Sequence, residues 1–193
     1  EEVYTTLKAE YPDLPIFATI CAISVETNNT AQLINAGRQV AEYSDIVGLS
    51  IYPYLLGDIG LRGRANPQNL PDNWLSRWVE IDPEKPFAIT ETAYIAEDLS
   101  MPDFGISISG TEEYQANYVE RLLYEAQLYN AEFVIWFIVR DYDAFVITIE
   151  GFGIEAEAFL IWRDTGLFDE QGRPRPALAI WDSWLTIPQS SAR

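Results

Sequence analysis

The segment PFAITETAYI, residues 86 to 95, is an apolar, strand-like run that carries a carboxylate, Glu91. Desolvation of a carboxylate at the end of a buried strand costs free energy unless the charge is paired or used. Two interpretations of Glu91 are open: a structural ion pair with Arg140 or another base, or a functional group. The chain contains no histidine. That absence excludes Ser-His and Cys-His catalysis within these residues and argues against a zinc site.

Other polar and aromatic residues lie at the ends of strand-like runs in the same way. They are Tyr52 and Tyr54, then Tyr94 beside Glu91, then Trp136, Arg140 and Asp141. Strand ends can be polar simply because they meet solvent, but the number of aromatic rings favours a binding site. Aromatic rings stack on pyranose faces, and a carboxylate can attack an anomeric carbon or stabilise an oxocarbenium-like transition state. A nearby tyrosine hydroxyl would hold that carboxylate ionised. The residues therefore predict sugar chemistry.

Four strand-like runs alternate with helical patterns along the chain. The expected strands cover 14–24, 45–55, 85–95 and 131–141, and the expected helices cover 30–44, 69–81, 111–130 and 173–185. Continuous apolar strands between helices are typical of a parallel sheet covered by helices. A doubly wound sheet and a (β/α)8 barrel both fit. No Gly-rich nucleotide loop follows a strand, which favours the barrel.

Side-chain alternation along each strand predicts which residues share a face. If Glu91 faces the barrel axis, so do Phe87 and Ile89. The same parity in the neighbouring strands points six more residues inward: Gly48, Ser50, Tyr52, Val134, Trp136 and Ile138. We therefore expect Glu91 to project into a cleft that it shares with Tyr52 and Trp136.

Two connections, 95–110 and about 142–162, are long for a barrel. Loops of that length are usually functional or disordered. Because both follow strands, we expect both to overhang the site and to shape a substrate groove. Tyr94 and Trp162 are the expected stacking residues.

The composition limits the class of partner. Thirty acids against twelve bases give a net charge of -18, which argues against nucleic acid and anionic membranes as partners. A solvated acidic surface explains this charge most simply, and adaptation to salt is the alternative. The length fits one domain. No run approaches the roughly 20 apolar residues of a membrane span. The charged start does not resemble a signal peptide. Cys21 is the only cysteine, so no internal disulfide forms and the compartment stays open.

Four motifs carry a resemblance to a known group of enzymes. DIVGLSIYPY, PFAITETAY, FVIWF and DTGLFDEQGRPRPAL occur in the order and spacing of clan A glycoside hydrolases. The sequence most resembles the endo-β-1,4-galactanases and their cellulase-like relatives, over about residues 14–185. The resemblance implies an α/β fold that is the C-terminal half, strands five to eight, of a TIM (β/α)8 barrel. Residues 1–193 would then form one partial domain without the first four βα units.

The resemblance also implies roles by position. Glu91 resembles the catalytic nucleophile at the end of strand seven of a retaining β-glycosidase. Trp136 resembles the strand-eight tryptophan that floors the sugar site, and Tyr52, or else Tyr54, resembles the strand-six aromatic residue beside the nucleophile. No cofactor or metal is implied. We expect Tyr94 and Asp141 to contact substrate as well, and the resemblance favours a secreted or periplasmic location.

The sequence departs from the clan in one functional motif. The clan's acid/base lies in an Asn-Glu pair after strand four, and no Asn-Glu dipeptide occurs here. One interpretation is a C-terminal half whose acid/base lies in a missing N-terminal half. A second places the partner carboxylate locally, at Glu26 or Asp141, about 5 to 5.5 Å from the nucleophile for retention and about 6.5 to 9.5 Å for inversion. A third is a non-catalytic carbohydrate-binding or scaffold module.

An open half-barrel predicts an unstable monomer. Its edge strands, 14–24 and 131–139, are long and apolar, and such edges recruit other strands. We expect the chain to pair with its N-terminal half or with a second copy, with a carbohydrate as substrate.

Overall fold

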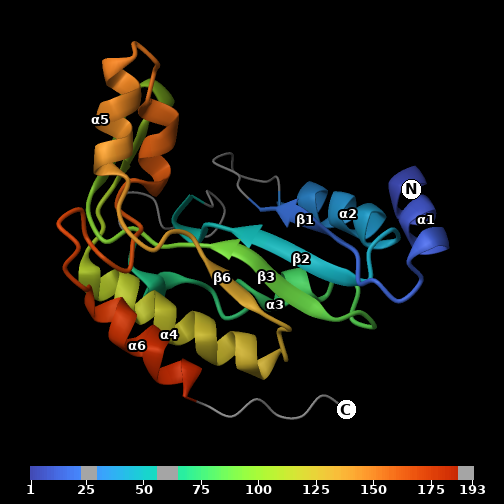
Figure 1. Cartoon of the computed structure of the whole chain (residues 1–193). Coiled ribbons are helices and arrows are strands. Elements are labelled where there is room, and N and C mark those ends of the chain that lie inside the picture. The colour runs from blue at the N-terminus through green and yellow to red at the C-terminus, as the bar shows by residue number, and fades with distance from the viewer. Residues whose placement is uncertain (23–29, 56–64, 187–193) are drawn as a thin grey trace. The chain divides into compact units, whose positions relative to one another are not determined.

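The computed structural model describes residues 1–22, 30–55 and 65–186. These residues form two compact units. Figure 1 shows their helices and strands. The first unit comprises Glu1–Leu61, Asn69–Thr92 and Glu125–Ile135, and the second comprises Arg62–Gln68, Ala93–Tyr124 and Trp136–Arg193. No helix in the described part of the chain is long and apolar enough to cross a membrane.

A four-stranded sheet organises the first unit. Its strands are β1 (Phe17–Cys21), β2 (Ile46–Ile51), β3 (Phe87–Thr92) and β6 (Val134–Trp136), in the order β1-β2-β3-β6. Strand β2 pairs with β1 and with β3 in parallel. The α/β class with a parallel sheet is therefore confirmed, as the continuous apolar runs predicted.

The strands are shorter than the sequence pattern suggested. The run 14–24 yields five strand residues and the run 131–141 yields three. Strands β1 and β6 are the edges of this sheet, as expected, but the expectation that both edges are long is wrong. Four of the five residues of β1 are exposed, and Ile20 alone among them is buried. An edge strand has lost the neighbour that would cover it, so its apolar residues stay in contact with solvent.

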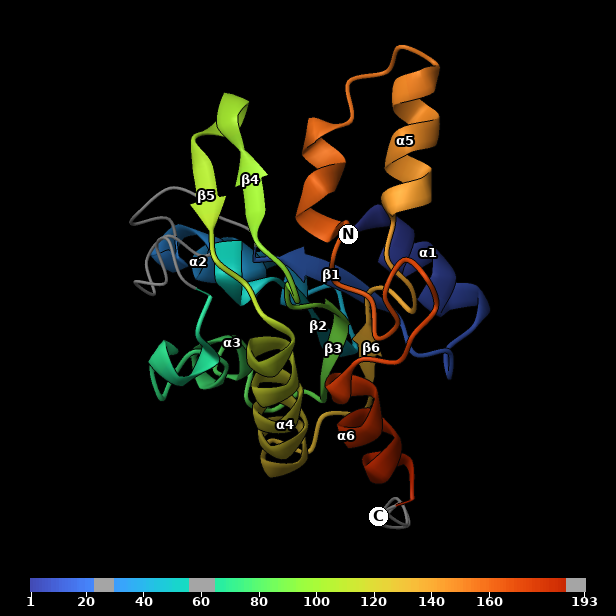
Figure 2. The same ribbon diagram turned by 90° about the vertical axis from the view of Figure 1, so that its left-hand side faces the viewer.

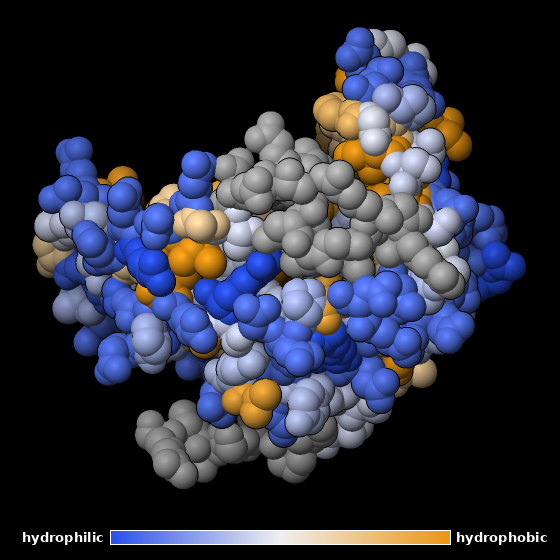
Figure 3. Space-filling view, turned by 180° about the vertical axis from the view of Figure 1, so that it is seen from behind, coloured by the Kyte–Doolittle hydropathy of each residue, from blue (hydrophilic) through white to orange (hydrophobic). Residues whose placement is uncertain are grey.

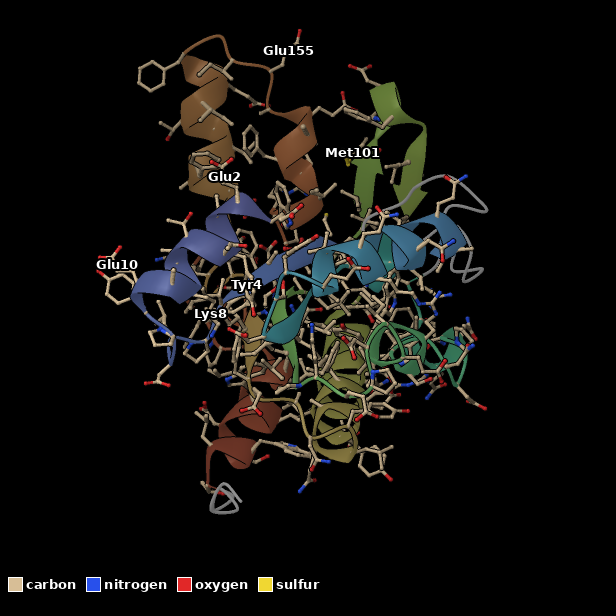
Figure 4. The ribbon with its side chains drawn as sticks, turned by 90° about the vertical axis from the view of Figure 1, so that its right-hand side faces the viewer. Glu2, Tyr4, Lys8, Glu10, Met101 and Glu155 are labelled. Carbon is tan, nitrogen blue, oxygen red and sulfur yellow. The ribbon has the colours of Figure 1, made fainter. Side chains whose placement is uncertain are left out.

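The described residues of the first unit include the α-helices α1 (Glu2–Glu10), α2 (Thr30–Ala41) and α3 (Ser76–Val79). Helix α1 is held by Asp45, which precedes β2. The Lys8 ammonium lies 2.9 Å from Asp45 Oδ2, the Tyr4 hydroxyl donates to Oδ1 at 2.8 Å, and the Ile16 amide donates to Oδ2 at 2.8 Å. Figure 4 shows Tyr4 and Lys8 on α1. These contacts lower the pKa of Asp45 to about 2, with the hydrogen bond from Lys8 as the largest cause.

The expected helix 69–81 is wrong in extent, since α3 has four residues. Proline at 67 and 71 lacks the amide hydrogen that a helix needs, and Pro67–Asn69 forms a 3-10 turn instead. The apolar residues of this segment still enter the core. Trp74, Leu75 and Trp78 are fully buried.

The second unit contains the hairpin β4 (Leu99–Met101) and β5 (Ile106–Ile108), and the helices α4 (Glu112–Leu128), α5 (Asp143–Gly151) and α6 (Pro176–Leu185). Helix α4 begins as the sequence predicted, because the Thr111 hydroxyl accepts the Tyr114 amide hydrogen at 3.1 Å. The last four residues of α4 lie in the first unit.

The two long connections contain regular structure. Residues 95–110 form the β4–β5 hairpin, whose turn is closed by a left-handed Gly105 with φ of 64°. Residues 143–162 form an arm: α5, a loop, and the 3-10 helix η5 (Glu157–Trp162). Strand β4 and η5 contact each other, and Figure 2 shows the hairpin and the arm side by side.

Candidate active site

A break in register places Glu91. Leu49 pairs with Ile89, but the next pair is Ser50 with Glu91, so Thr90 is an extra residue in β3. Paired residues of parallel strands point to the same face, so Glu91 shares the face of Ser50. Phe87 pairs with Val47, on the opposite face. The expectation that Phe87 and Ile89 share a face with Glu91 is therefore wrong, because the bulge inverts the parity between them.

The bulge brings Glu91 and Tyr52 together. The Tyr52 hydroxyl donates a hydrogen bond to Glu91 Oε1. Tyr52 follows β2 and is fully buried, whereas Glu91 is half-buried. A carboxylate that is held by a buried tyrosine and still reaches solvent can act on a ligand, so this geometry agrees with the contact expected from the sequence.

Neighbouring residues fix the two strand ends. The Thr92 hydroxyl donates to the Ile51 carbonyl at 2.7 Å, and Thr92 is fully buried. Tyr54 packs edge-on against Tyr52, with ring centroids 6.1 Å apart. The first contact fixes the backbone just before Tyr52, and the second restricts the Tyr52 ring. Together they keep the Tyr52 hydroxyl directed at Glu91.

The other aromatic residues expected at the site belong to the second unit. Tyr94 is fully buried and stacks on Tyr118 of α4 at 4.4 Å, and the ring of Tyr118 lies 6.1 Å from that of Trp136. Burial raises the pKa of Tyr94 well above its usual value. Trp136 also contacts Trp181 of α6 edge-on at 6.0 Å. These four rings form one continuous cluster within the second unit.

A buried glutamine that the sequence analysis missed holds this cluster in place. Gln115 of α4 is fully buried, and its Nε2 donates to the carbonyls of Tyr94, Thr165 and Gly166 at 3.1, 3.3 and 3.0 Å. The Trp136 indole donates to the same Thr165 carbonyl at 3.0 Å. The peptide bond between residues 137 and 138 is cis. Gln115 occupies an apolar position in the helical stripe, and that is the one signal by which sequence reasoning could have found it.

Asp141 lies in a buried ionic cluster. Its side chain has no exposed surface, and Arg175 contacts both of its oxygens, with Nη1 3.1 Å from Oδ1 and Nη2 2.8 Å from Oδ2. Asp141 Oδ1 also accepts the Gly166 amide hydrogen at 2.8 Å. A side chain at position 166 would not fit, because its Cβ would lie 2.5 Å from the Asp141 nitrogen and 2.6 Å from Oδ1.

Burial raises the pKa of Asp141 to about 7, although Arg175 and the Gly166 amide lower it. The charges of Asp164 and Asp143 act in the same direction as burial. Arg175 itself is 2% exposed and also lies 2.8 Å from Glu97. The sequence analysis missed Arg175, because an arginine between two prolines in a turn is usually solvated.

Two groups of carboxylates in the described part of the chain are close enough to share a cation: Glu97, Asp141 and Asp164, and Asp141, Asp143 and Glu170. The guanidinium of Arg175 already contacts Asp141 and Glu97. Arg163 lies 2.6 Å from Asp164 and 3.9 Å from Asp143, so two arginines and four of these five carboxylates form an ion-pair network.

The remaining expected residues take different places. Arg140, the base considered as an ion-pair partner for Glu91, donates to the Glu170 carbonyl. Trp162 ends η5 and packs edge-on against Phe137 at 5.8 Å. Glu26 lies outside the described residues.

Comparison with known proteins gives fold information. No protein-family model and no curated protein matches the chain. Solved structures match, among them a family 17 glycoside hydrolase, a β-1,3-glucanosyltransferase from Rhizomucor miehei, with a TM-score of 0.56 and 13% identity. The β-D-glucuronidase of Dictyoglomus thermophilum matches with a TM-score of 0.58 and 17% identity, and that of Faecalibacterium prausnitzii with 0.58 and 20%.

These matches cover most of this chain and part of each neighbour. The shares of this chain are 92%, 97% and 99%, and the shares of the neighbours are 55%, 28% and 28%. The chain therefore has a glycosidase-like α/β fold and spans about half of the first neighbour and about a quarter of the other two. Because the sequence identities are low, the similarity concerns the fold alone.

Proposed function

We propose that this chain is part of a glycoside hydrolase that cleaves β-glycosidic bonds of a polysaccharide or oligosaccharide by a retaining mechanism, with Glu91 as the nucleophile. The observation that carries the proposal is the hydrogen bond from Tyr52 to Glu91 at adjacent strand ends. The glycosidase-like fold supports it, since catalytic groups of barrel enzymes lie at the carboxyl ends of strands.

In this mechanism, one Glu91 oxygen attacks the anomeric carbon while the leaving oxygen takes a proton from a general acid. Water then attacks the glycosyl-enzyme ester, and the same acid, now a base, removes the proton from that water. The Tyr52 hydrogen bond orients the carboxylate and stabilises the charge that returns to it when the ester breaks. Tyr52 is thus a positioning residue for the nucleophile.

The other site residues would serve the substrate. Tyr54 would support Tyr52 beside the nucleophile, and Trp136 and Tyr94 are proposed as substrate-binding residues from their positions at strand ends in the sequence. Asp141 would support the site indirectly, by holding the segment around Gly166 in place. Its carboxylate is already engaged by Arg175 and by the Gly166 amide. The hairpin and the arm would border the substrate groove.

We place the general acid in further βα units that complete a barrel around this half. Strands β1 and β6 are the sheet edges at which those units would pair. A second source of the acid is Asp141, whose raised pKa of about 7 suits proton donation near neutral pH. The absence of exposed surface on its side chain makes this source less favourable.

Partner strands, from the rest of a barrel or from a second copy, would cover the exposed residues of β1. We expect the isolated chain to self-associate in sedimentation velocity runs at micromolar concentration, more strongly as salt screens its charge. A folded monomer at all salt concentrations would contradict this expectation.

Glu91→Gln tests the nucleophile in the barrel-complete protein. We expect turnover to fall at least about 10³-fold while folding is unchanged, since the amide keeps the shape and loses the nucleophile. Glu84→Gln, an exposed change in the same unit, is the matched control. Mass spectrometry after inactivation by an activated 2-deoxy-2-fluoro glycoside should find the label on Glu91. Near-normal turnover by Glu91→Gln, or a label elsewhere, would remove Glu91 from this role.

A non-catalytic carbohydrate-binding module is the alternative. It predicts that the barrel-complete protein binds oligosaccharides without hydrolysing them, and that Glu91→Gln leaves this binding unchanged.

A further inference from the structure

A pocket of about 580 Å³ lies in the second unit, away from the Glu91–Tyr52 pair in sequence and in its lining. One wall is the turn of the hairpin, with Asp103 and Phe104. The other wall is the end of the arm, with residues 150 and 153–158. The volume falls within the usual range for small-molecule sites, about 300 to 1,000 Å³.

The two walls of the pocket are fastened to each other. The Asp103 amide donates to Glu157 Oε1 at 2.9 Å, which links the hairpin turn to η5. Met101 of β4 is 3% exposed, since β4 packs against η5 (Figure 4). The pocket is therefore a built feature of the unit, held by a hydrogen bond from a backbone amide to a side-chain carboxylate and by a buried side chain.

Apolar surface forms part of the lining and is open to solvent. Phe104 is 59% exposed and Ile154 is 54% exposed. Large apolar side chains at this exposure, grouped in a hollow, mark a binding surface more often than a solvated one. In the space-filling view, hydrophobic and hydrophilic side chains lie next to each other on this projecting part of the unit (Figure 3).

The polar part of the lining has one sign of charge. Asp103, Glu150, Glu155 and Glu157 contribute four carboxylates, and none of the described lining residues is basic. The pKa of Glu157 is raised by desolvation, and the charges of Asp103 and Glu155 raise it further. Carboxylates that repel one another around an apolar floor are complementary to a ligand with an apolar face and a positive charge.

We propose that this pocket binds a cationic amino-sugar unit of an oligosaccharide, with the pyranose face against Phe104 and the ammonium group among Glu150, Glu155 and Glu157. The choice of a sugar rests on the proposed function. The choice of a cationic sugar rests on the lining. A hexosamine has both properties the pocket requires: a ring face that stacks on an aromatic side chain and an ammonium that donates to carboxylates.

Other occupants fit the same lining less well. A uronic acid oligomer would bring carboxylates to carboxylates. A second copy of the chain would bring its own net charge of -18. A neutral sugar would cover the apolar floor but would leave the carboxylate charges uncompensated.

Calorimetry with three hexasaccharides tests the proposal: a glucosamine hexamer, its fully N-acetylated form, and a galacturonic acid hexamer. At about pH 5.5 carboxylates are ionised and hexosamine amines are protonated. We expect the glucosamine hexamer to bind at least about 10-fold more tightly than the acetylated form, with binding weakened by salt. The galacturonate should not bind.

Two variants locate the binding. Glu150→Gln with Glu155→Gln removes two charges at exposed positions, and Phe104→Ala removes the floor; both should weaken the glucosamine hexamer about 10-fold. Glu157 is left unchanged because it joins the two walls. The matched control is Glu10→Gln with Glu42→Gln, an equal charge change at exposed positions of the first unit, which should leave binding unchanged.

Equal affinity for the glucosamine hexamer and its acetylated form would overturn the proposal. An equal loss of affinity in the pocket variant and in the control variant would also overturn it, because the hexamer would then be attracted by the overall charge. Glu91→Gln separates this proposal from the proposed function. If the pocket is right, that variant binds the glucosamine hexamer normally whether or not turnover is lost. Circular dichroism verifies that each variant is folded.

Discussion

Replacing Asp141 with asparagine should remove the loss of stability that this residue causes as pH rises from 5 to 8. The folded-state pKa of Asp141, about 7, lies above its ordinary value of 3.8 because burial disfavours the charged form. The folded state therefore binds this proton more tightly than the unfolded state does. The stability that the neutral group contributes is complete below about pH 3.8 and is lost as pH rises to about 7.

The size of the effect follows from the two pKa values. One pH unit corresponds to about 1.4 kcal/mol, so ionising Asp141 in place costs about 4 kcal/mol in total and about 3 kcal/mol between pH 5 and 8. Asparagine is neutral at every pH, and its oxygen can accept the hydrogen bonds that Asp141 Oδ1 accepts from Gly166 and Arg175. Its amide nitrogen takes the place of Oδ2, which lies 2.8 Å from Arg175 Nη2, and this unfavourable contact lowers stability by the same amount at every pH. The difference in unfolding free energy between the variant and the wild type should therefore increase by about 3 kcal/mol over this range.

Urea denaturation followed by tryptophan fluorescence at pH 5, 6, 7 and 8 measures this difference. All of these values lie above the isoelectric point of about 4.1. Asp182→Asn, at an exposed position of α6, is the control and should show no such trend. If attraction to Arg175 outweighs burial, the difference between variant and wild type should instead fall as pH rises, and the reasoning would be refuted.

The remaining predictions concern single contacts. Tyr52→Phe in the barrel-complete protein should lower kcat by about 10- to 100-fold, the cost of a hydrogen bond to a charged group, with KM nearly unchanged; an unaltered kcat would exclude Tyr52 as a positioning residue. Asp45→Asn should lower the unfolding free energy at pH 7 by about 1 kcal/mol, since the contact with Lys8 is partly solvated. Because the pKa of Asp45 is lowered, its contribution to the unfolding free energy is complete above about pH 3.8 and is lost as pH falls through about 2. An equal loss of unfolding free energy in the variant at pH 7 and at pH 2 would contradict this prediction.

Strand number, strand type and helix α4 could be predicted because their signals are local. Apolar runs between helical stripes indicate a parallel sheet, and Thr111 before two glutamates indicates a helix start. The bounds could not be predicted, because a strand ends where pairing ends. Residues 14–16 are as apolar as those that follow, but β1 begins at Phe17, where pairing with Ile46 begins.

The arm and the hairpin were missed for a different reason. The α5 sequence DAFVITIEG is rich in β-branched residues, which have low helix propensity, and its mostly exposed apolar side chains do not form the stripe that indicates a helix. The hairpin strands have three residues each, too few for an alternating pattern. Contacts between hairpin and arm stabilise both segments, and no local pattern encodes such contacts.

Thr90 explains why Glu91 contacts Tyr52 and does not share a face with Phe87 and Ile89. Counting residues along β3 places Glu91 on the face of Phe87 and Ile89, and counting along β2 places Tyr52 on the face of Ser50. An unbroken ladder would pair Thr90 with Ser50 and turn Glu91 to the other face. The extra residue shifts Glu91 opposite Ser50, where the Tyr52 hydroxyl reaches it. The carboxylate at the end of an apolar strand thus acquires a hydrogen-bond donor and an opening to solvent, which answers the desolvation cost that its sequence position implies.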